Sequence, residues 1–407
     1  MTSNFNLKLR SALPLFIVAP HDTAIAAQLL HHEMRSYFLS IMCSLLLATR
    51  SVAARSRTLA FVAHRNRPFT SSSFQLQATQ TQATTTTVAQ VTQDSIAWLQ
   101  ARNVPEPEGS VYHLLAFALN LDWSDGFVQL QNDKQAILQD RLVTTDEQAT
   151  LQIMLNRRAT MEPLQYILGQ WDFLDYTLLM QAPLLCPRPE TEELVLHVER
   201  DIKQQLQIMK EANNDKQQQQ QQQQQHDVVR ILDIGCGTGA IGIALCDRLM
   251  AATHVTALDI EPIAITVSNQ NAQRILMGGN NNDNNNNNQY HAELCDIANY
   301  NNGLLFDMVV SNPPYIPRTD MSTLSDDVVN YESDTALCGG PDGLDVVRLI
   351  IDKLPTLCAP GAPCWMEVDP SHPTLIQHML DNNTKVDYHS TVQDMFGQDR
   401  FVKLVVR

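Results

Sequence analysis

Between Asp94 and about Gly169, apolar side chains recur every three to four residues, which is the period of an amphipathic helix. The stretches "SIAWLQARN", "VYHLLAFALNLDW" and "DKQAILQDRLVTTDEQATLQIMLNRRA" all follow this period. The pattern predicts a small all-α domain over residues 91–169. This segment carries no chemical motif of its own, so we expect it to pack or to bind a partner.

From about Val228 the pattern changes to short apolar runs that alternate with helical segments. Strands are expected at "VVRILDIG", "HVTALDI", "FDMVVSN", "APCWMEVD" and "RFVKLVVR", and helices at "GAIGIALCDRL", "EPIAITVSNQNAQRI" and "LDVVRLIIDKL", the last beginning near Asp342. Such alternation predicts an α/β domain over residues 228–407, with a mostly parallel sheet covered by helices on both faces. Residues 170–227 are expected to be a linker that contains a hairpin, a helix and a glutamine tract.

Two low-complexity tracts interrupt this pattern where loops are expected. One is a glutamine run, Gln217 to Gln225, and the other an asparagine run, Asn280 to Asn288, broken by Asp283. Long surface insertions cost little closure entropy, about 0.6 kcal/mol for each doubling of length. We therefore assign the tracts no function.

Charge divides the chain unevenly. Residues 1–90 hold 8 Lys and Arg against only Asp22 and Glu33, a net charge of +6, and are rich in Arg, Ser and Ala. This composition is typical of a targeting leader for the mitochondrion or, alternatively, a plastid, and a disordered tail is the other interpretation. The remaining residues hold 20 basic and 42 acidic side chains, so we expect no direct contact with nucleic acid.

The lengths of the apolar runs and the spacing of the cysteines argue against a membrane protein, a zinc protein and a disulfide-rich protein. No stretch of about 18 uninterrupted apolar residues occurs, so we expect no membrane span. The 8 cysteines are scattered, with no Cys-x-x-Cys pair, which argues against a zinc site and a disulfide scaffold. No metal is expected.

A glycine-rich turn follows the first expected strand of the α/β domain. In "ILDIGCGTGAIGIAL", three glycines lie between strand and helix, where they let the backbone turn sharply and a ligand approach it: Gly235, Gly237 and Gly239. From Gly237 the stretch also spells G-x-G-x-x-G, which would suit a dinucleotide. A turn without a ligand is the remaining alternative.

Two acidic residues bear on the ligand. Asp259, at the end of the second strand, is placed to bond ribose hydroxyls, which NAD and S-adenosylmethionine both have. Asp233 precedes the first glycine by two residues and would place a carboxylate beside the ligand. A carboxylate repels a pyrophosphate but suits the ammonium of a methionine moiety, so the pattern favours S-adenosylmethionine.

The stretch "DMVVSNPPYIP" ends a buried strand, because prolines cannot donate to a sheet ladder. It is expected over the same crevice as the glycine turn. The side-chain oxygen of Asn312 and the carbonyl of Pro313 would accept both N–H bonds of an amide or exocyclic amine and stabilise its transition state. Tyr315 would offer its ring as a wall. The alternative is that Asn-Pro merely begins a turn.

The chain from about Asp94 to Arg407 resembles the HemK/PrmC family, the N5-glutamine methyltransferases of peptide chain release factors. The resemblance rests on "EPLQYILGQWDF", "PRPETEELV", "LDIGCGTGAIGIAL", "SNPPYIP", "GGPDGLDVVRLI" and "DMFGQDRFV", which occur in the family's order. The glycine motif marks only class I methyltransferases. The NPPY motif restricts the expected reaction to methylation of an amino group. The stretch "PRPETEELV", together with the helical domain, restricts the expected family to this one.

The resemblance implies a class I, Rossmann-like methyltransferase whose substrate is the glutamine of the Gly-Gly-Gln loop in a class 1 release factor. It implies these cofactor residues: Asp233, Gly235, Cys236, Gly237, Thr238, Gly239, Asp259, Asp296, Ile297 and Asn312, with Asp296 and Ile297 at the adenine. The acceptor amide would be gripped by Asn312, Pro313, Pro314 and Tyr315. Arg188 and Glu190 are expected to shape the rim or, alternatively, to form an ion pair at a helix start.

Two segments depart from the family pattern. Ser333 and Asp334 stand where Pro-Arg is usual, and Asp369 stands where a glycine is usual. Two other functions stay open at this point: an adenine-N6 DNA methyltransferase, which uses a similar turn on a flipped base, and a non-catalytic methyltransferase-like binding module. We expect a monomer.

Overall fold

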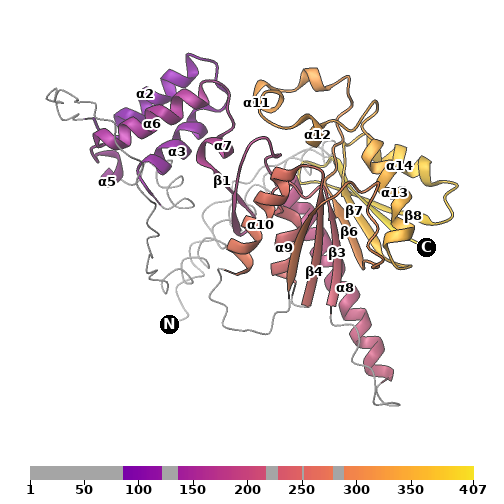
Figure 1. Ribbon diagram of the computed structural model, residues 1–407. Helices are drawn as coiled ribbons and strands as arrows, with labels where there is room; N and C mark the ends of the chain where they lie inside the picture. The colour runs from indigo at the N-terminus through magenta and orange to yellow at the C-terminus, as the bar shows by residue number, and fades with distance from the viewer. Residues whose placement is uncertain (1–85, 122–135, 217–227, 250–251, 278–287) are drawn as a thin grey trace, which may run out of the picture. The chain divides into compact units, whose positions relative to one another are not determined.

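The computed structural model describes residues 86–121, 136–216, 228–249, 252–277 and 288–407 (Figure 1). Nearly all of the expected leader, the whole glutamine tract and all but the last residue of the asparagine tract lie outside the described residues.

The N-terminal part of the described chain is helical, as its apolar period predicts. It comprises α2 (Val88–Gln100), α3 (Pro107–Ala118), α5 (Ala136–Gln139), α6 (Thr145–Arg158) and α7 (Leu164–Leu168). Buried side chains from α2, α3, α6 and α7 form one core, which includes Leu99, Leu114 and Leu151. Gly169, with a φ of 70°, ends α7 and leads into a hairpin of β1 (Gln170–Phe173) and β2 (Tyr176–Leu179).

A seven-stranded sheet forms the larger part of the fold. Its strands are β3 (Val228–Ile234), β4 (Ala252–Asp259), β5 (Gln289–Leu294), β6 (Met308–Ser311), β7 (Pro363–Glu367), β8 (Val386–Gln393) and β9 (Asp399–Val406). They lie in the order β5-β4-β3-β6-β7-β9-β8, and β9 alone runs opposite to the other six strands. The prediction of a mostly parallel sheet is confirmed.

Helices cover both faces of this sheet, because alternate residues of its central strands are buried on opposite sides. Ile231 and Val310 pack with α8 (Pro189–Lys216) and α9 (Ala240–Arg248), while Leu232 and Val309 pack with α13 (Asp345–Leu357) and α14 (His372–Leu380). Figure 1 shows α9 and α10 (Pro262–Leu276) beside β4, and α13 and α14 beside β8. The short elements η2 (Met321–Thr323), α11 (Asp326–Val329) and α12 (Asp334–Leu337) lie between β6 and α13 in the chain.

Two details differ from the expected elements. α13 begins at Asp345 rather than near Asp342, because Gly343 has a φ of 80° and Asp342 accepts a bond from the Leu344 amide (3.2 Å) in a turn before the helix. The edge strand β5 was not named, since only Ala292 in it is buried and an apolar run is missing.

The last residue of the asparagine tract fixes the start of β5. The Asn288 side chain accepts a bond from the Thr253 amide (2.9 Å) and donates one to the Cys246 carbonyl (2.6 Å). No helix in the described ranges has the length and apolar character that a membrane span requires.

Asn271 on α10 ties the hairpin to the glycine-rich turn. Its fully buried side chain accepts a bond from the Leu179 amide (2.7 Å) and donates to the carbonyls of Leu179 (3.2 Å) and Thr238 (2.9 Å). One amide group therefore satisfies three backbone groups from two segments that are far apart in the sequence.

We predict that Asn271→Ala lowers the free energy of unfolding by about 2 to 3 kcal/mol, because it leaves buried backbone groups without partners. The matched control is Asn269→Ala on the exposed side of the same helix, for which we expect a change within about 0.5 kcal/mol. Urea unfolding followed by circular dichroism measures both. Equal losses for the two variants would contradict the anchoring role.

Candidate cofactor and acceptor site

The site is defined by the pairing of β3 with β6. These strands are parallel neighbours, with Asp233 opposite Val310 and Ile234 opposite Ser311. The residues that follow, Gly235 and Asn312, therefore leave the sheet at the same edge. The strand order reverses at this pair, and in such sheets ligands bind at the reversal, beyond the carboxyl ends of the strands.

The glycine turn after β3 is held by the end of β4. The amides of Gly235 and Cys236 both donate to the Leu258 carbonyl (2.8 and 3.0 Å), and the amide of Gly237 donates to the Asp259 carboxylate (2.9 Å). Gly239 caps α9 with a φ of 83°, and a Cβ there would lie 2.7 Å from the Ile243 side chain. These contacts give the turn one conformation.

A cavity of about 290 Å³ opens above this turn. Nine of the residues that the sequence singled out line it: Gly235, Cys236, Gly237, Thr238, Asp259, Asp296, Ile297, Asn312 and Pro314. Apolar side chains such as Leu258, Val346 and Leu349 complete the wall. The structure thus brings the glycine turn, the acid after β4 and the NPPY turn to one cavity.

Asp233 does not lie in this cavity wall, and the expectation that its carboxylate stands beside the ligand needs correction. The side chain is fully buried, and one oxygen accepts a bond from the Gly242 amide (3.0 Å) in α9. Burial raises the pKa of Asp233 to about 7. Like Gly239, which also lies outside the lining, Asp233 supports the turn and the start of α9.

A second, smaller cavity of about 140 Å³ lies next to the first, and Asn312 lines both. Pro313, Tyr315 and Arg188 line the second cavity, together with apolar side chains that include Leu324 and Val328. Glu190, in the first turn of α8, lines neither of these two cavities.

Arg188 forms an ion pair with Glu332, at 2.9 and 3.1 Å to its two carboxylate oxygens. The Glu332 side chain is only 2% exposed, and burial raises its pKa while Arg188 opposes the rise. Arg188 therefore lines a cavity, and it is paired with Glu332 rather than with the neighbouring Glu190. Glu332 was missed, because its partner lies 144 residues earlier in the chain.

A chain of hydrogen bonds leads from Asn312 into the protein. The Asn312 amide nitrogen donates to the Thr191 hydroxyl (3.0 Å), which donates to the Glu367 carboxylate (2.8 Å). The other Glu367 oxygen accepts a bond from the Tyr315 hydroxyl (3.5 Å). Thr191 and Glu367 were not among the expected site residues. The one signal in the sequence was a carboxylate at the end of an apolar strand, where a buried charge calls for a partner.

The NPPY turn is braced by the loop before α13. The Ile316 amide donates to the Leu337 carbonyl, and the Gly339 amide donates to the Ile316 carbonyl, both at 2.9 Å. A Cβ on Gly343 would lie 2.2 Å from the Tyr315 carbonyl and 2.8 Å from the His372 ring. Only glycine allows the loop to approach the turn so closely.

The lining fits a ligand that carries an adenosine and a charged, compact end. Asp259 offers carboxylate oxygens for ribose hydroxyls, the apolar side chains suit a base, and the glycine turn exposes backbone at close range. Within the described ranges, no three His, Cys, Asp or Glu side chains are grouped so that they could bind a metal ion.

Comparison with known proteins agrees with this architecture. A model described as the PrmC N-terminal domain matches residues 90–169, and one described as a methyltransferase domain matches residues 225–384. The fold and the site define a class I methyltransferase. A release factor glutamine methyltransferase from Rhodospirillum rubrum is 30% identical over 308 residues, which cover 75% of this chain and 82% of that protein. The chain belongs to the release factor glutamine methyltransferase family.

Two further relatives and one solved structure are also similar to this chain. The human "MTRF1L release factor glutamine methyltransferase" is 29% identical over 310 residues, or 75% of this chain and 83% of that protein. The Geobacter sulfurreducens release factor glutamine methyltransferase is 29% identical over 316 residues, or 78% and 95%. A solved ribosomal protein L11 methylase from Lactobacillus delbrueckii is 14% identical, with a TM-score of 0.33 over 55% of this chain and 80% of that one.

We predict that Gly343→Ala lowers kcat on the order of 100-fold, because the added methyl group must displace the Tyr315 backbone and misplace the turn. Gly361→Ala is the matched control, since Gly361 has a similar φ of 87° but open space around its Cβ position. The control isolates the cost of the left-handed backbone, about 1 to 2 kcal/mol of stability. Steady-state kinetics and thermal unfolding of both variants provide the measurement. A control that loses as much kcat would refute the bracing role.

Proposed function

We propose that this protein transfers a methyl group from S-adenosylmethionine to the side-chain amide nitrogen of a glutamine in a class 1 release factor, at the Gly-Gly-Gln motif. The observation that carries the proposal is the position of Asn312, which lines both cavities. An amide that enters through the smaller cavity reaches Asn312 next to the space where the methyl donor fits. The names of the relatives supply the substrate class.

The larger cavity takes the cofactor in this proposal. The backbone from Gly235 to Thr238 cradles its methionine end, Asp259 bonds the ribose, and Asp296 and Ile297 lie at the adenine. S-adenosylmethionine supplies an electrophilic methyl group, so neither an acid for the leaving group nor a metal is needed.

The residues of the NPPY turn handle the acceptor. An amide nitrogen is a weak nucleophile, because its lone pair is delocalised. The Asn312 side-chain oxygen and the Pro313 carbonyl accept its two N–H bonds, which stabilises the positive charge that develops on nitrogen during transfer. Tyr315 and Pro314 confine the amide in line with the methyl group, and such positioning contributes about 7 to 11 kcal/mol to lowering a barrier. Arg188, held in place by the buried Glu332, forms part of the rim through which the substrate loop approaches.

The proposal also covers the location of this protein in the cell. We infer import into the mitochondrion, with a plastid as the alternative, from the Arg-rich composition of residues 1–90. Expression of this segment fused to a fluorescent protein tests the inference. A fusion that stays diffuse in the cytosol would contradict it.

The deciding experiment offers the purified protein S-adenosylmethionine with either an intact class 1 release factor or duplex and single-stranded DNA. Mass spectrometry of the digested release factor is expected to show one added methyl group on the Gly-Gly-Gln peptide. Methylated adenine together with an unmodified peptide would contradict glutamine methylation and identify a DNA methyltransferase instead. Cofactor binding without any transfer would favour a binding module.

For the acceptor role we predict that Asn312→Ala binds the cofactor within about threefold of wild type but loses on the order of 100- to 1000-fold in kcat, as expected when one transition-state partner is removed. Calorimetry measures cofactor binding, and methylation of the release factor measures kcat. Asn269→Ala, exposed on α10, is the control for a general effect of removing an amide. Weak cofactor binding with normal kcat at saturation would contradict the assigned role.

A further inference from the structure

We propose that Thr191 is a positioning residue whose hydroxyl, oriented by Glu367, turns the side-chain amide of Asn312 so that its oxygen faces the acceptor. This inference rests on the proposed function, because it says how the acceptor-binding oxygen is presented. It assigns a task to two buried residues outside the NPPY turn: Thr191 on α8, which lines the larger cavity, and Glu367 on β7, which lines neither cavity.

The direction of the hydrogen bonds carries the argument. A threonine hydroxyl has one hydrogen to donate, and an ionised carboxylate only accepts. Glu367 therefore takes the Thr191 hydrogen at 2.8 Å, and the Thr191 oxygen is left only to accept. The group that faces it at 3.0 Å must then be the N–H₂ of Asn312. Because the amide is planar, its oxygen points away from Thr191, which leaves it for the substrate.

Without this constraint the two ends of the amide are nearly equivalent in shape. A flipped Asn312 would present N–H₂ to the N–H bonds of the acceptor, so two donors would meet and the transition state would lose its partner. Catalysis therefore requires one orientation of the Asn312 amide, and an asparagine at this position does not by itself set that orientation.

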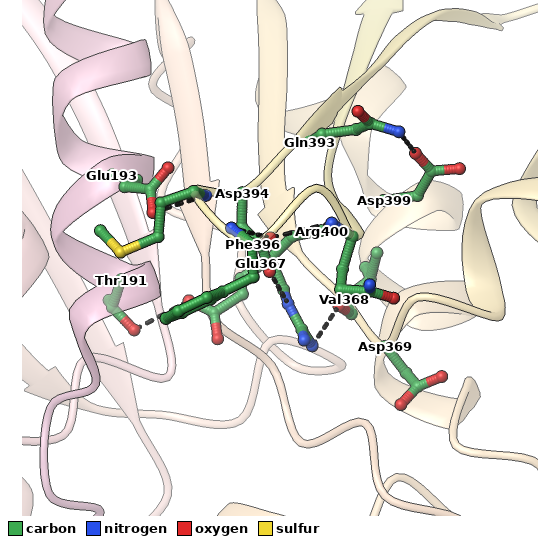
Figure 2. A network of polar contacts seen from close by, with 12 residues as sticks. Thr191, Glu193, Glu367, Val368, Asp369, Gln393, Asp394, Phe396, Asp399 and Arg400 are labelled. Atoms are coloured by element: carbon green, nitrogen blue, oxygen red, sulfur yellow. Dashed lines mark hydrogen bonds and ion pairs between the residues drawn. The ribbon is translucent and has the colours of Figure 1, made fainter. Parts of the chain in front are cut away.

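Burial strengthens the hydrogen bonds that Thr191 makes to Glu367 and Asn312. Thr191 is 5% exposed and Glu367 is 1% exposed, so water does not compete for their bonds. Thr191 belongs to the first turn of α8 and Glu367 ends β7, a neighbour of β6 in the sheet. Figure 2 shows the Thr191 side chain directed from its helix toward Glu367 at the end of the strand. Both groups therefore sit on rigid elements.

Several groups surround Glu367 and set its charge. Burial raises the pKa of Glu367 to about 7, the Thr191 and Tyr315 hydroxyls and Arg400 oppose the rise, and Glu190 adds to it. Arg400 is itself fixed by Asp394 (3.3 Å) and by the Val368 carbonyl (3.2 Å), as Figure 2 shows.

Because Glu367 titrates, the chain of hydrogen bonds from Glu367 through Thr191 to Asn312, here called the relay, depends on pH. Above the pKa, the carboxylate accepts and the amide is oriented. Below it, a proton on Oε2 of Glu367 donates to the Thr191 oxygen, so the Thr191 hydrogen turns toward Asn312 and the orientation of the amide is lost. We therefore expect kcat to fall as the pH drops through about 7.

The test compares Thr191→Val, which keeps the shape and removes the hydroxyl, with Thr191→Ser, which keeps the hydroxyl. Thr266→Val is the control, because Thr266 is exposed on α10 and bonds only to its own helix, at the Pro262 carbonyl. Each protein is assayed for methylation of the release factor across pH 6 to 9, for cofactor binding and for thermal unfolding. We expect Thr191→Val to lose on the order of 10- to 100-fold in kcat, with cofactor affinity within about threefold of wild type.

The pH profile separates positioning from a structural role. In Thr191→Val the decline of kcat below pH 7 should disappear, because Glu367 no longer communicates with Asn312, while Thr191→Ser should restore both kcat and the decline. Glu367 also bonds the Tyr315 hydroxyl, and Asp233 has a pKa in the same range, so a decline that persists in Thr191→Val would assign the effect to one of these groups and overturn the proposal. Normal kcat in Thr191→Val would overturn it as well.

A second measurement follows the orientation of Asn312 directly, so it depends neither on the folding of the Thr191 variants nor on the choice of substrate. The side-chain N–H₂ resonances of Asn312, assigned by their loss in Asn312→Asp, should shift with a midpoint near pH 7 in the wild-type protein and not in Glu367→Gln. This readout needs no release factor, so it still decides the proposal if wild-type protein fails to methylate that substrate. Resonances that titrate alike in both proteins would reject the relay.

Discussion

The site depends on one backbone constraint, the parallel pairing of β3 with β6. The other five strands extend the sheet on the two sides of this pair, and a shift of one residue between β3 and β6 would reverse the faces of every side chain in the shifted strand. The register Ile234 to Ser311 brings the glycine turn and the NPPY turn out at the same height. The Ser311 hydroxyl adds a side-chain bond to the Ile234 carbonyl (2.7 Å), so the strands are joined where the cavity begins.

Around this pair, the structure surrounds Asn312 with supports from distant parts of the chain. Thr191 comes from the helix that precedes β3, Glu367 from β7 of the same sheet, and Gly343 from the loop before α13. None of them has to contact a substrate to matter. A reactive group that uses positioning rather than acid, base or metal chemistry needs such supports, because its contribution depends on where its lone pairs point.

The sequence predicts the fold and most of the cavity, because these follow from local signals. Alternating apolar runs, glycines after a strand and prolines at a strand end each act within a few residues. Thr191, Glu332 and Glu367 were missed because their contacts join segments more than 100 residues apart, 144 residues for Arg188 and Glu332 and 176 for Thr191 and Glu367. Asp233 was misplaced for another reason: its partner, the Gly242 amide, is only 9 residues away, but the local sequence does not show that the side chain turns toward α9 rather than toward the cavity. β5 was not named for a different reason, since an edge strand buries too little to show an apolar run.

The anchoring of Asn288 has a consequence for how the gene can vary. Runs of a single amino acid are encoded by repeats that expand and contract readily during replication. Here the last asparagine of the run is fastened to Thr253 and Cys246, so copies gained or lost fall between Met277 and that anchor. Doubling that segment would cost only about 0.6 kcal/mol in closure entropy. Alleles with different asparagine counts should therefore encode proteins with the same β5 register and the same catalytic centre.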